Sequence, residues 1–224
     1  MLTKTRSTIE KGYDGKNVCL VGNPKVGKST FASQLGDSVY FAATEAGHKF
    51  LEVYKSDINK FQDFEQLVND LLTEKHPFTT LVIDVFDKLY ELAQDEICVR
   101  NKVKSISDVP FGAGYSAARK LITSNVLKLN QKKIGVTFIT HSKEKEIKQD
   151  AVTWNAVATS MPDSVEKEIL AMCDFIFFCY SDKDGKRLIR TKPNKFVTAA
   201  GDRSKNLPEI MPLDAKLVLE EMKK

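Results

Sequence analysis

The sequence predicts an α/β fold: a mostly parallel sheet flanked by helices, with an antiparallel hairpin at its C-terminal edge. Short apolar runs alternate with segments of helical periodicity, which is the order produced when helices connect parallel strands. The runs are apolar at successive positions, as expected for strands that are buried on both faces. An Asp-Gly pair at positions 184–185 separates the last two runs, and this pair favours a tight hairpin.

The predicted elements follow one another along the whole chain. We expect strands at residues 18–21, 39–43, 81–85, 135–140, 175–180 and 187–191. We expect helices at residues 29–35, 60–75, 88–99, 115–129 and 166–172, and a last helix at about 213–223. Pro77 ends the helix of residues 60–75. We expect one domain over residues 1–224, with a core of about residues 16–210.

The composition is that of an ordinary globular protein, with 42% hydrophobic and 29% charged residues among 224. The apolar run at 175–180 is too short to cross a bilayer, and the first fifteen residues hold no apolar stretch of the kind found in secretory signals. We therefore expect a cytoplasmic protein with no membrane partner. The four cysteines form no C-x-x-C pair and the three histidines are scattered, so we expect reduced thiols and no structural zinc site.

The strongest motif is a phosphate-binding loop between the first strand and the first helix. Residues 22–29 fit the pattern G-x-x-x-x-G-K-[ST] in full. Its glycines let successive backbone N–H groups point at phosphate oxygens, and the following helix adds its positive end. Lys28 is expected at the β- and γ-phosphates, Ser29 at Mg²⁺ and Thr30 near the α-phosphate. The predicted nucleotide-binding residues are Gly22, Asn23, Pro24, Lys25, Val26, Gly27, Lys28, Ser29 and Thr30.

Three polar residues lie at the ends of other predicted strands, at the same edge of the sheet. Asp84 ends an apolar run, and there it can hold the water shell of Mg²⁺ from a neighbouring strand; Asp87 is its rival. Glu45 is placed to polarise an attacking water, although a surface-loop acid is an equal alternative. His141 is placed to contact the γ-phosphate, or else it caps the end of its strand.

The net charge of +4 is unevenly distributed. Residues 183–205 hold eight basic and two acidic side chains, so the remainder of the chain is slightly acidic. Such a segment can meet the phosphates of a nucleic acid or of a nucleotide in a neighbouring subunit, or it can be a solvated hairpin.

Taken together, these motifs resemble the RecA-like P-loop ATPases. The likeness is greatest to the phage-type nucleotide-binding or AAA-family ATPases, some of which are linked to single-strand annealing recombination. It covers about residues 16–210. It rests on the phosphate loop and on VIDVFDKL, Gly-Ala-Gly-Tyr at 112–115, FITHS, CDFIFF and GDRSKNLP. A phage origin, with action in a bacterial cytoplasm, is part of what this resemblance implies.

The resemblance implies a role for each candidate residue. Glu45 matches the catalytic glutamate, Asp84 the Walker B aspartate and His141 the polar sensor of the class. Residues 100–116 and 142–163 match its two DNA-contacting loops, the second of which carries balanced charge and Trp154, a base-stacking residue or a core anchor. Arg203 matches a finger donated to the next subunit, with Lys192 and Lys195 as rivals. Here Gly201-Asp202-Arg203 replaces the usual Lys-Asp-Arg.

The expected function is therefore that of a Mg²⁺-dependent ATPase in recombination or replication. It is expected to bind ATP, Mg²⁺ and single-stranded DNA and to assemble head to tail as a ring or filament. The first alternative is an ATP-gated module that hydrolyses slowly and docks a recombination or replication partner. The second alternative is a small-molecule phosphotransferase, which would need an arginine-rich lid.

Overall fold

The computed structural model describes residues 8, 10–149 and 152–224. Its centre is a sheet with the strand order β11-β9-β8-β1-β5-β4-β2-β3, and β10 also pairs with β8. The strands of this sheet are β1 Val18–Gly22, β2 Val39–Ala43, β3 Tyr54–Asp57, β4 Thr80–Asp84, β5 Gly135–Thr140, β8 Phe175–Ser181, β9 Arg187–Arg190, β10 Gly201–Asp202 and β11 Ile210–Pro212. A separate two-stranded sheet consists of β6 Ser142–Gln149 and β7 Val152–Thr159.

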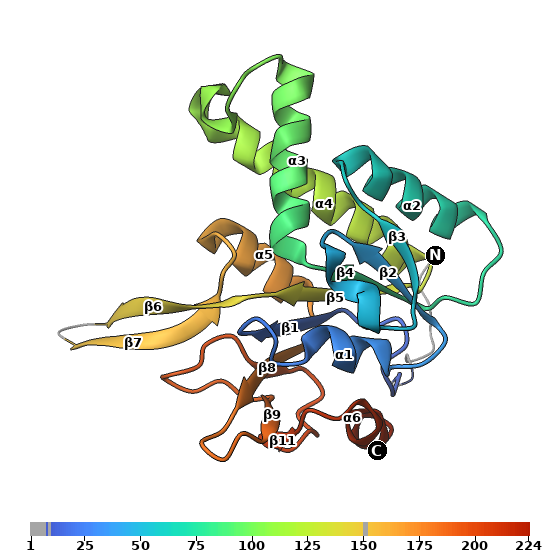
Figure 1. Cartoon of the computed structure of the whole chain (residues 1–224). Helices are drawn as coiled ribbons and strands as arrows, with labels where there is room; N and C mark the ends of the chain where they lie inside the picture. The colour runs from blue at the N-terminus through green and yellow to red at the C-terminus, as the bar shows by residue number, and fades with distance from the viewer. Residues whose placement is uncertain (1–7, 9, 150–151) are drawn as a thin grey trace.

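Helices cover both faces of the central sheet (Figure 1). The α-helices are α1 Lys28–Ser33, α2 Phe61–Thr73, α3 Phe86–Asn101, α4 Ala113–Gln131, α5 Asp163–Met172 and α6 Ala215–Met222. Short 3-10 helices occur at Ala46–Phe50, Ile106–Asp108 and Pro110–Gly112. Among the residues described, no helix has the length and apolarity needed to cross a membrane.

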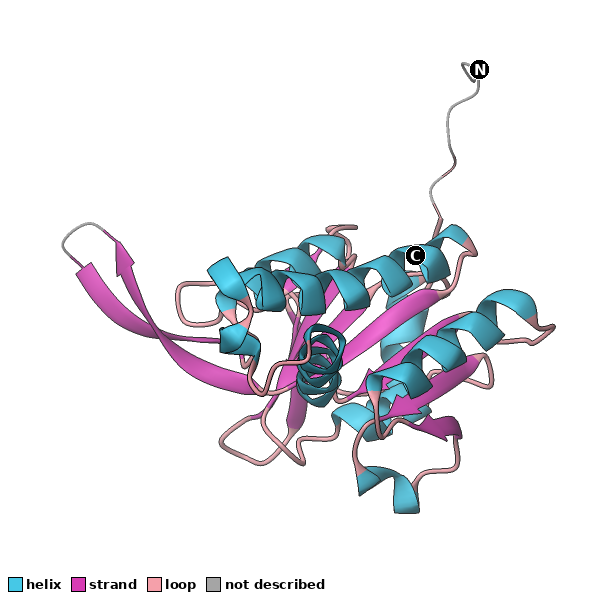
Figure 2. Ribbon diagram, turned by 90° about the horizontal axis from the view of Figure 1, so that it is seen from above, coloured by secondary structure: helices cyan, strands magenta, loops and turns pink. Residues whose placement is uncertain are grey.

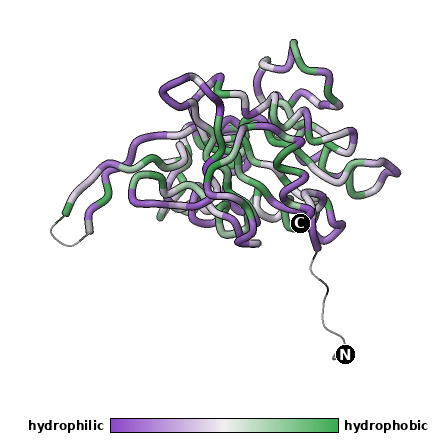
Figure 3. Tube along the Cα trace, turned by 90° about the horizontal axis from the view of Figure 1, so that it is seen from below, coloured by the Kyte–Doolittle hydropathy of each residue, from purple (hydrophilic) through white to green (hydrophobic). Residues whose placement is uncertain are grey.

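The two faces of the sheet form two apolar cores, because successive strand side chains point to opposite sides. Cys19 and Val21 of β1 pack with buried residues of α2, α3, α4 and α5. Val18 and Leu20 pack on the other face with α1 and α6. Figure 3 shows the apolar segments of the chain gathered mainly in the interior of the molecule. Burial on both faces explains why these strands have no polar alternation in the sequence.

The predicted fold class is confirmed as a mostly parallel α/β sheet with an antiparallel C-terminal edge. β1 pairs in parallel with β5 and β8, and β4 pairs in parallel with β2 and β5. β9 runs antiparallel to β8 around the predicted turn, and β11 extends this edge. All four cysteines are free, as expected.

Several elements differ from the prediction. The strands β3, β10 and β11 are too short, or too polar, to stand out in the sequence. Residues 142–163 contain a long antiparallel hairpin, β6–β7, rather than a loop, and this hairpin projects from the sheet (Figures 1 and 2). Its alternating Lys and Glu residues face solvent and therefore carry no apolar period.

Candidate nucleotide-binding site

The phosphate loop joins β1 to α1, so it lies between a strand and a helix as predicted. Gly27 has φ 112°, a left-handed conformation that disfavours a side chain. At Gly22, an added Cβ would lie 2.2 Å from the carbonyl oxygen of Cys179, so β8 passes too close for any larger residue. Both glycines of the motif are thus required by the backbone itself.

Lys28 turns back over the loop that precedes it. Its ammonium donates to the carbonyl oxygens of Gly22 at 2.6 Å and Asn23 at 2.9 Å. The side chain is buried, and this burial lowers the pKa of Lys28 below its usual value. The cation is therefore held at the centre of the loop, where a phosphate would contact it.

A cavity of about 540 Å³ opens beside this loop. It brings together most of the residues predicted from separate parts of the sequence. Those that line it are Pro24, Lys25, Gly27, Lys28, Ser29, Thr30, Glu45, Asp84 and His141. The volume lies in the ordinary range for small-molecule sites. Gly47, His48, Phe50, Leu51, Val85, Ile139 and Arg187 complete the lining.

Asp84 lies at the carboxyl end of β4, but β4 is not adjacent to the strand of the phosphate loop. β5 lies between them, so the prediction that Asp84 ends the strand next to the phosphate-loop strand is wrong. Asp84 nevertheless faces the same cavity as Ser29. A carboxylate and a hydroxyl are hard oxygen ligands of the kind that Mg²⁺ prefers, so the two residues fit the predicted metal.

His48 contacts Asp84, and no motif or spacing in the sequence singles it out. The two side chains are buried, and Nε2 of His48 lies 2.9 Å from Oδ2 of Asp84. Nδ1 of His48 lies 3.2 Å from the carbonyl oxygen of Glu45. The hydrogen bond to Asp84 raises the pKa of His48 above its usual value. His48 thus orients the Asp84 carboxylate and fixes the backbone of Glu45.

The position of Glu45 is set by the preceding residue. The backbone N–H of Thr44 donates to the carbonyl oxygen of Asp84 at 2.9 Å. Its hydroxyl oxygen accepts from the N–H of Val85 at 2.7 Å and lies 3.0 Å from the carbonyl oxygen of Val85. These contacts join the ends of β2 and β4, so the exposed Glu45 side chain lies at the same cavity as Asp84.

Asp87, the alternative to Asp84 as the predicted Mg²⁺ residue, is not among the residues that line the cavity. Its carboxylate accepts from the hydroxyl of Thr140 at 2.9 Å and from the backbone N–H of His141 at 3.2 Å. It also accepts from the hydroxyl of Ser160. Asp87 therefore connects the start of α3 to both ends of the β6–β7 hairpin and holds His141 at the end of β5.

The base of the hairpin also contacts the phosphate loop directly. The hydroxyl of Ser142 donates to Oδ1 of Asn23 at 2.8 Å. His141 precedes Ser142, and Nδ1 of His141 is buried with no hydrogen-bond partner among the described residues. One end of the hairpin is thus joined to the nucleotide cavity.

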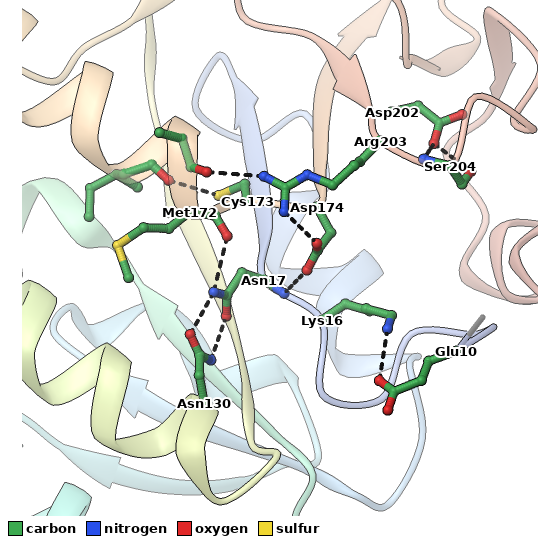
Figure 4. Close-up of polar contacts among 12 residues, drawn as sticks. Glu10, Lys16, Asn17, Asn130, Met172, Cys173, Asp174, Asp202, Arg203 and Ser204 are labelled. Atoms are coloured by element: carbon green, nitrogen blue, oxygen red, sulfur yellow. Dashed lines mark hydrogen bonds and ion pairs between the residues drawn. The ribbon is translucent and has the colours of Figure 1, made fainter. Parts of the chain in front are cut away.

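Arg203 does not lie near its own phosphate loop. The register of β10 with β8 places it at the amino end of β8, whereas Gly22 pairs with Cys179 toward the other end. Its guanidinium contacts a carboxylate oxygen of Asp174 and the carbonyl oxygen of Ala171, both at 3.1 Å (Figure 4). The rivals Lys192 and Lys195 are exposed and lie outside the lining of the cavity.

A match to a known family covers most of the chain, at residues 14–204, and the family is described as AAA domain. The chain belongs to the AAA domain family. No curated protein sequence matches this AAA domain protein significantly.

The solved structures that resemble the AAA domain protein include the following two, both at low identity. The RadB recombinase is 14% identical with a TM-score of 0.49, and the match covers 84% of this chain and 86% of RadB. A KaiC-like protein from the hyperthermophilic archaeon Pyrococcus horikoshii is 14% identical with a TM-score of 0.48, covering 79% of this chain and 78% of the other.

Proposed function

We propose that this AAA domain protein is a Mg²⁺-dependent ATPase that acts with single-stranded DNA in recombination or replication. The observation that carries the proposal is the single cavity lined by Lys28, Ser29, Glu45 and Asp84. These residues come from three separate strand ends, and together they supply a phosphate-binding cation, two oxygen ligands and a carboxylate base.

In the proposed mechanism, each residue acts on a different part of the bound ATP. Lys28 and the backbone of the phosphate loop hold the β- and γ-phosphates. Ser29 and Asp84 would hold Mg²⁺, which neutralises charge on these phosphates when it is bound. Glu45 accepts a proton from the attacking water and orients it. His141 contacts the γ-phosphate from the end of β5.

The DNA-binding part of the proposal rests on a surface beside the β6–β7 hairpin, which we call the hairpin flank: Trp154, Lys192, Lys195 and Phe196. Trp154 Nε1 donates to the carbonyl oxygen of Lys195 at 2.6 Å, and the Lys195 ammonium lies 4.7 Å from the centre of the Phe196 ring. Phe196 is 55% exposed. An exposed aromatic ring with exposed lysines suits a single strand, whose bases stack and whose phosphates need cations.

The lysines of the hairpin itself contribute less positive charge. Lys145 pairs with Asp163 at 2.8 Å and Lys148 with Glu146 at 2.9 Å. Lys143 donates to the carbonyl oxygen of Met161 at 2.9 Å. This internal pairing favours the alternative of a protein-docking hairpin gated by ATP, because a balanced surface does not attract DNA strongly.

The ATPase proposal is tested by phosphate release from Mg²⁺–ATP in the parent protein and in Lys28→Ala. Loss of the central cation should reduce turnover by at least about a hundredfold, the scale found when one preorganised charge contact is removed. Lys128→Ala, an exposed lysine on α4, is the matched control and should retain the parent rate. Parent-like hydrolysis by Lys28→Ala would contradict the proposed role of the loop.

A further inference from the structure

We infer that Arg187 binds the α- and β-phosphates of the nucleotide held in its own subunit. The inference rests on the proposed function and adds a ligand on the opposite side of the phosphate loop from Asp84. Arg187 lines the same cavity as Lys28, Ser29 and Thr30. Nη1 of Arg187 lies 3.3 Å from the position that a Cβ on Gly27 would occupy. The guanidinium therefore lies directly over the loop that contacts phosphates.

The fold fixes this placement from the backbone. Arg187 begins β9, where it pairs with Ser181 at the carboxyl end of β8. β8 runs parallel to β1, with Cys179 opposite Gly22, so this end of β8 lies beside the phosphate loop. The carbonyl oxygen of Arg187 accepts from the backbone N–H of Leu213 at 3.0 Å. Arg187 is thus anchored on a paired strand, and its side chain extends from there over the loop.

The guanidinium is available for an anionic ligand. The other four arginines in the described residues each pair with a carboxylate: Arg100 with Glu65 and Glu96, Arg119 with Glu168, Arg190 with Glu209 and Arg203 with Asp174. Within the same described residues, Arg187 has no carboxylate partner within 4.0 Å and no side-chain hydrogen bond. A planar guanidinium matches phosphate oxygens with two parallel hydrogen bonds, so an unpaired arginine at this loop suits a phosphate ligand.

The side of approach indicates which phosphates are contacted. In the strand order, β9 and β8 lie on one side of β1, and β5, β4 and β2 lie on the other. His141, Asp84 and Glu45 lie at or just after the carboxyl ends of these latter three strands, so hydrolysis of the γ-phosphate is placed on their side. Arg187 reaches the loop from the opposite side, away from the γ-phosphate, and this side of approach assigns it to the α- and β-phosphates. It therefore contacts groups that ATP and ADP share.

This role differs from that of a finger residue. A finger stabilises charge on a γ-phosphate bound by another subunit, so its loss reduces turnover and spares binding. Loss of Arg187 removes a contact made within one subunit. It should weaken binding of ADP and ATP alike, even in a monomer.

The experiment measures the dissociation constants of Mg²⁺–ADP and of Mg²⁺ with a non-hydrolysable ATP analogue by calorimetry. The proteins compared are the parent, Arg187→Ala, Arg187→Lys and Lys186→Ala. Arg187→Ala should weaken both nucleotides by roughly 10- to 100-fold, the range expected for a charge-assisted contact. Arg187→Lys should fall between parent and Ala, because it keeps the charge and loses the paired geometry. Lys186→Ala removes an adjacent exposed cation that lies outside the cavity lining, and it should bind like the parent.

Three results would overturn the inference. Parent-like affinities in Arg187→Ala would show that the side chain does not contact the nucleotide, while leaving the proposed ATPase function standing. A loss confined to the ATP analogue would place Arg187 at the γ-phosphate instead. A parent protein that binds neither nucleotide would contradict the proposed function itself. Thermal melting without nucleotide confirms folding, because the exposed Arg187 side chain is not part of either apolar core.

Discussion

Nε2 of His48 lies 2.9 Å from a carboxylate oxygen of Asp84, and both side chains are buried at the end of the parallel sheet. This pair joins the loop after β2 to the end of β4, so Glu45 and Asp84 are positioned by the same contact. His48, which is not part of the phosphate-loop motif, therefore connects the proposed base Glu45 to the proposed metal ligand Asp84.

The first prediction concerns the pH dependence of this pair in protein treated with a chelator. Because the folded state raises the pKa of His48, the protonated pair stabilises folding fully below the unfolded pKa of about 6.5. That stabilisation is lost as the pH rises through the raised folded pKa. His48→Gln should reduce the free energy of unfolding at pH 6 by roughly 1.5–3 kcal/mol, and by less at pH 9. Urea denaturation at both pH values checks this, and a pH-independent difference would contradict it.

The second prediction separates the chemistry of Glu45 from nucleotide binding. Glu45→Gln keeps the size of the side chain but cannot accept a proton. Turnover should fall by about 10²- to 10⁴-fold, while the dissociation constant for Mg²⁺–ADP stays within about twofold of the parent. Steady-state hydrolysis and calorimetry provide the two readouts. A drop in turnover of only two- to threefold would indicate that Glu45 is a surface-loop acid without a catalytic role. Glu52→Gln alters an acid outside the cavity lining and serves as the control.

The third prediction concerns Arg203, which lies toward the opposite end of β8 from its own phosphate loop. If it acts on the neighbouring subunit, Arg203→Ala should reduce turnover by up to about 10³- to 10⁵-fold and leave nucleotide binding intact. Mixing Arg203→Ala with Lys28→Ala should restore some hydrolysis, since mixed interfaces pair an intact loop with an intact finger.

The control for this experiment is each variant alone at the same total concentration. Asp174 keeps one contact in Arg203→Ala, because it also accepts from the backbone N–H of Asn17 at 3.0 Å. Parent-like turnover in Arg203→Ala would transfer the finger role to Lys192 or Lys195, or remove it altogether if the protein stays monomeric with ATP and DNA.

The fourth prediction concerns the hairpin flank. Replacing Lys192 and Lys195 together by Ala should weaken single-stranded DNA binding and flatten its dependence on salt, because fewer counterions are released. Phe196→Ala should weaken binding with little change in the salt slope, because stacking depends on the ring and not on charge. Fluorescence anisotropy over a salt series measures both quantities. Lys216→Ala, an exposed lysine on α6, is the control, and equal slopes in all variants would contradict the assignment.

Local spacing made the phosphate loop and the buried strands predictable. Gly22, Gly27 and Lys28 lie within seven residues of one another, and β1, β4 and β5 are buried on both faces and mostly apolar. The contact between His48 and Asp84 joins residues 36 positions apart and carries no spacing signal. Arg187 reaches Gly27 only because β8 lies beside β1, so its position depends on the topology of the sheet. The β6–β7 hairpin was not predicted because the side chains of β6 are largely exposed and its charges are balanced.

The measurement that tests the central claim most directly is the rate of Mg²⁺–ATP hydrolysis with and without single-stranded DNA, with Asp84→Asn as the inactive reference. The proposed function predicts hydrolysis by the parent that depends on Mg²⁺ and rises severalfold or more when single-stranded DNA is added. Asp84→Asn should bind nucleotide and show neither activity. Hydrolysis that is unchanged by DNA would favour the ATP-gated docking module, and no Mg²⁺-dependent hydrolysis under either condition would contradict the claim.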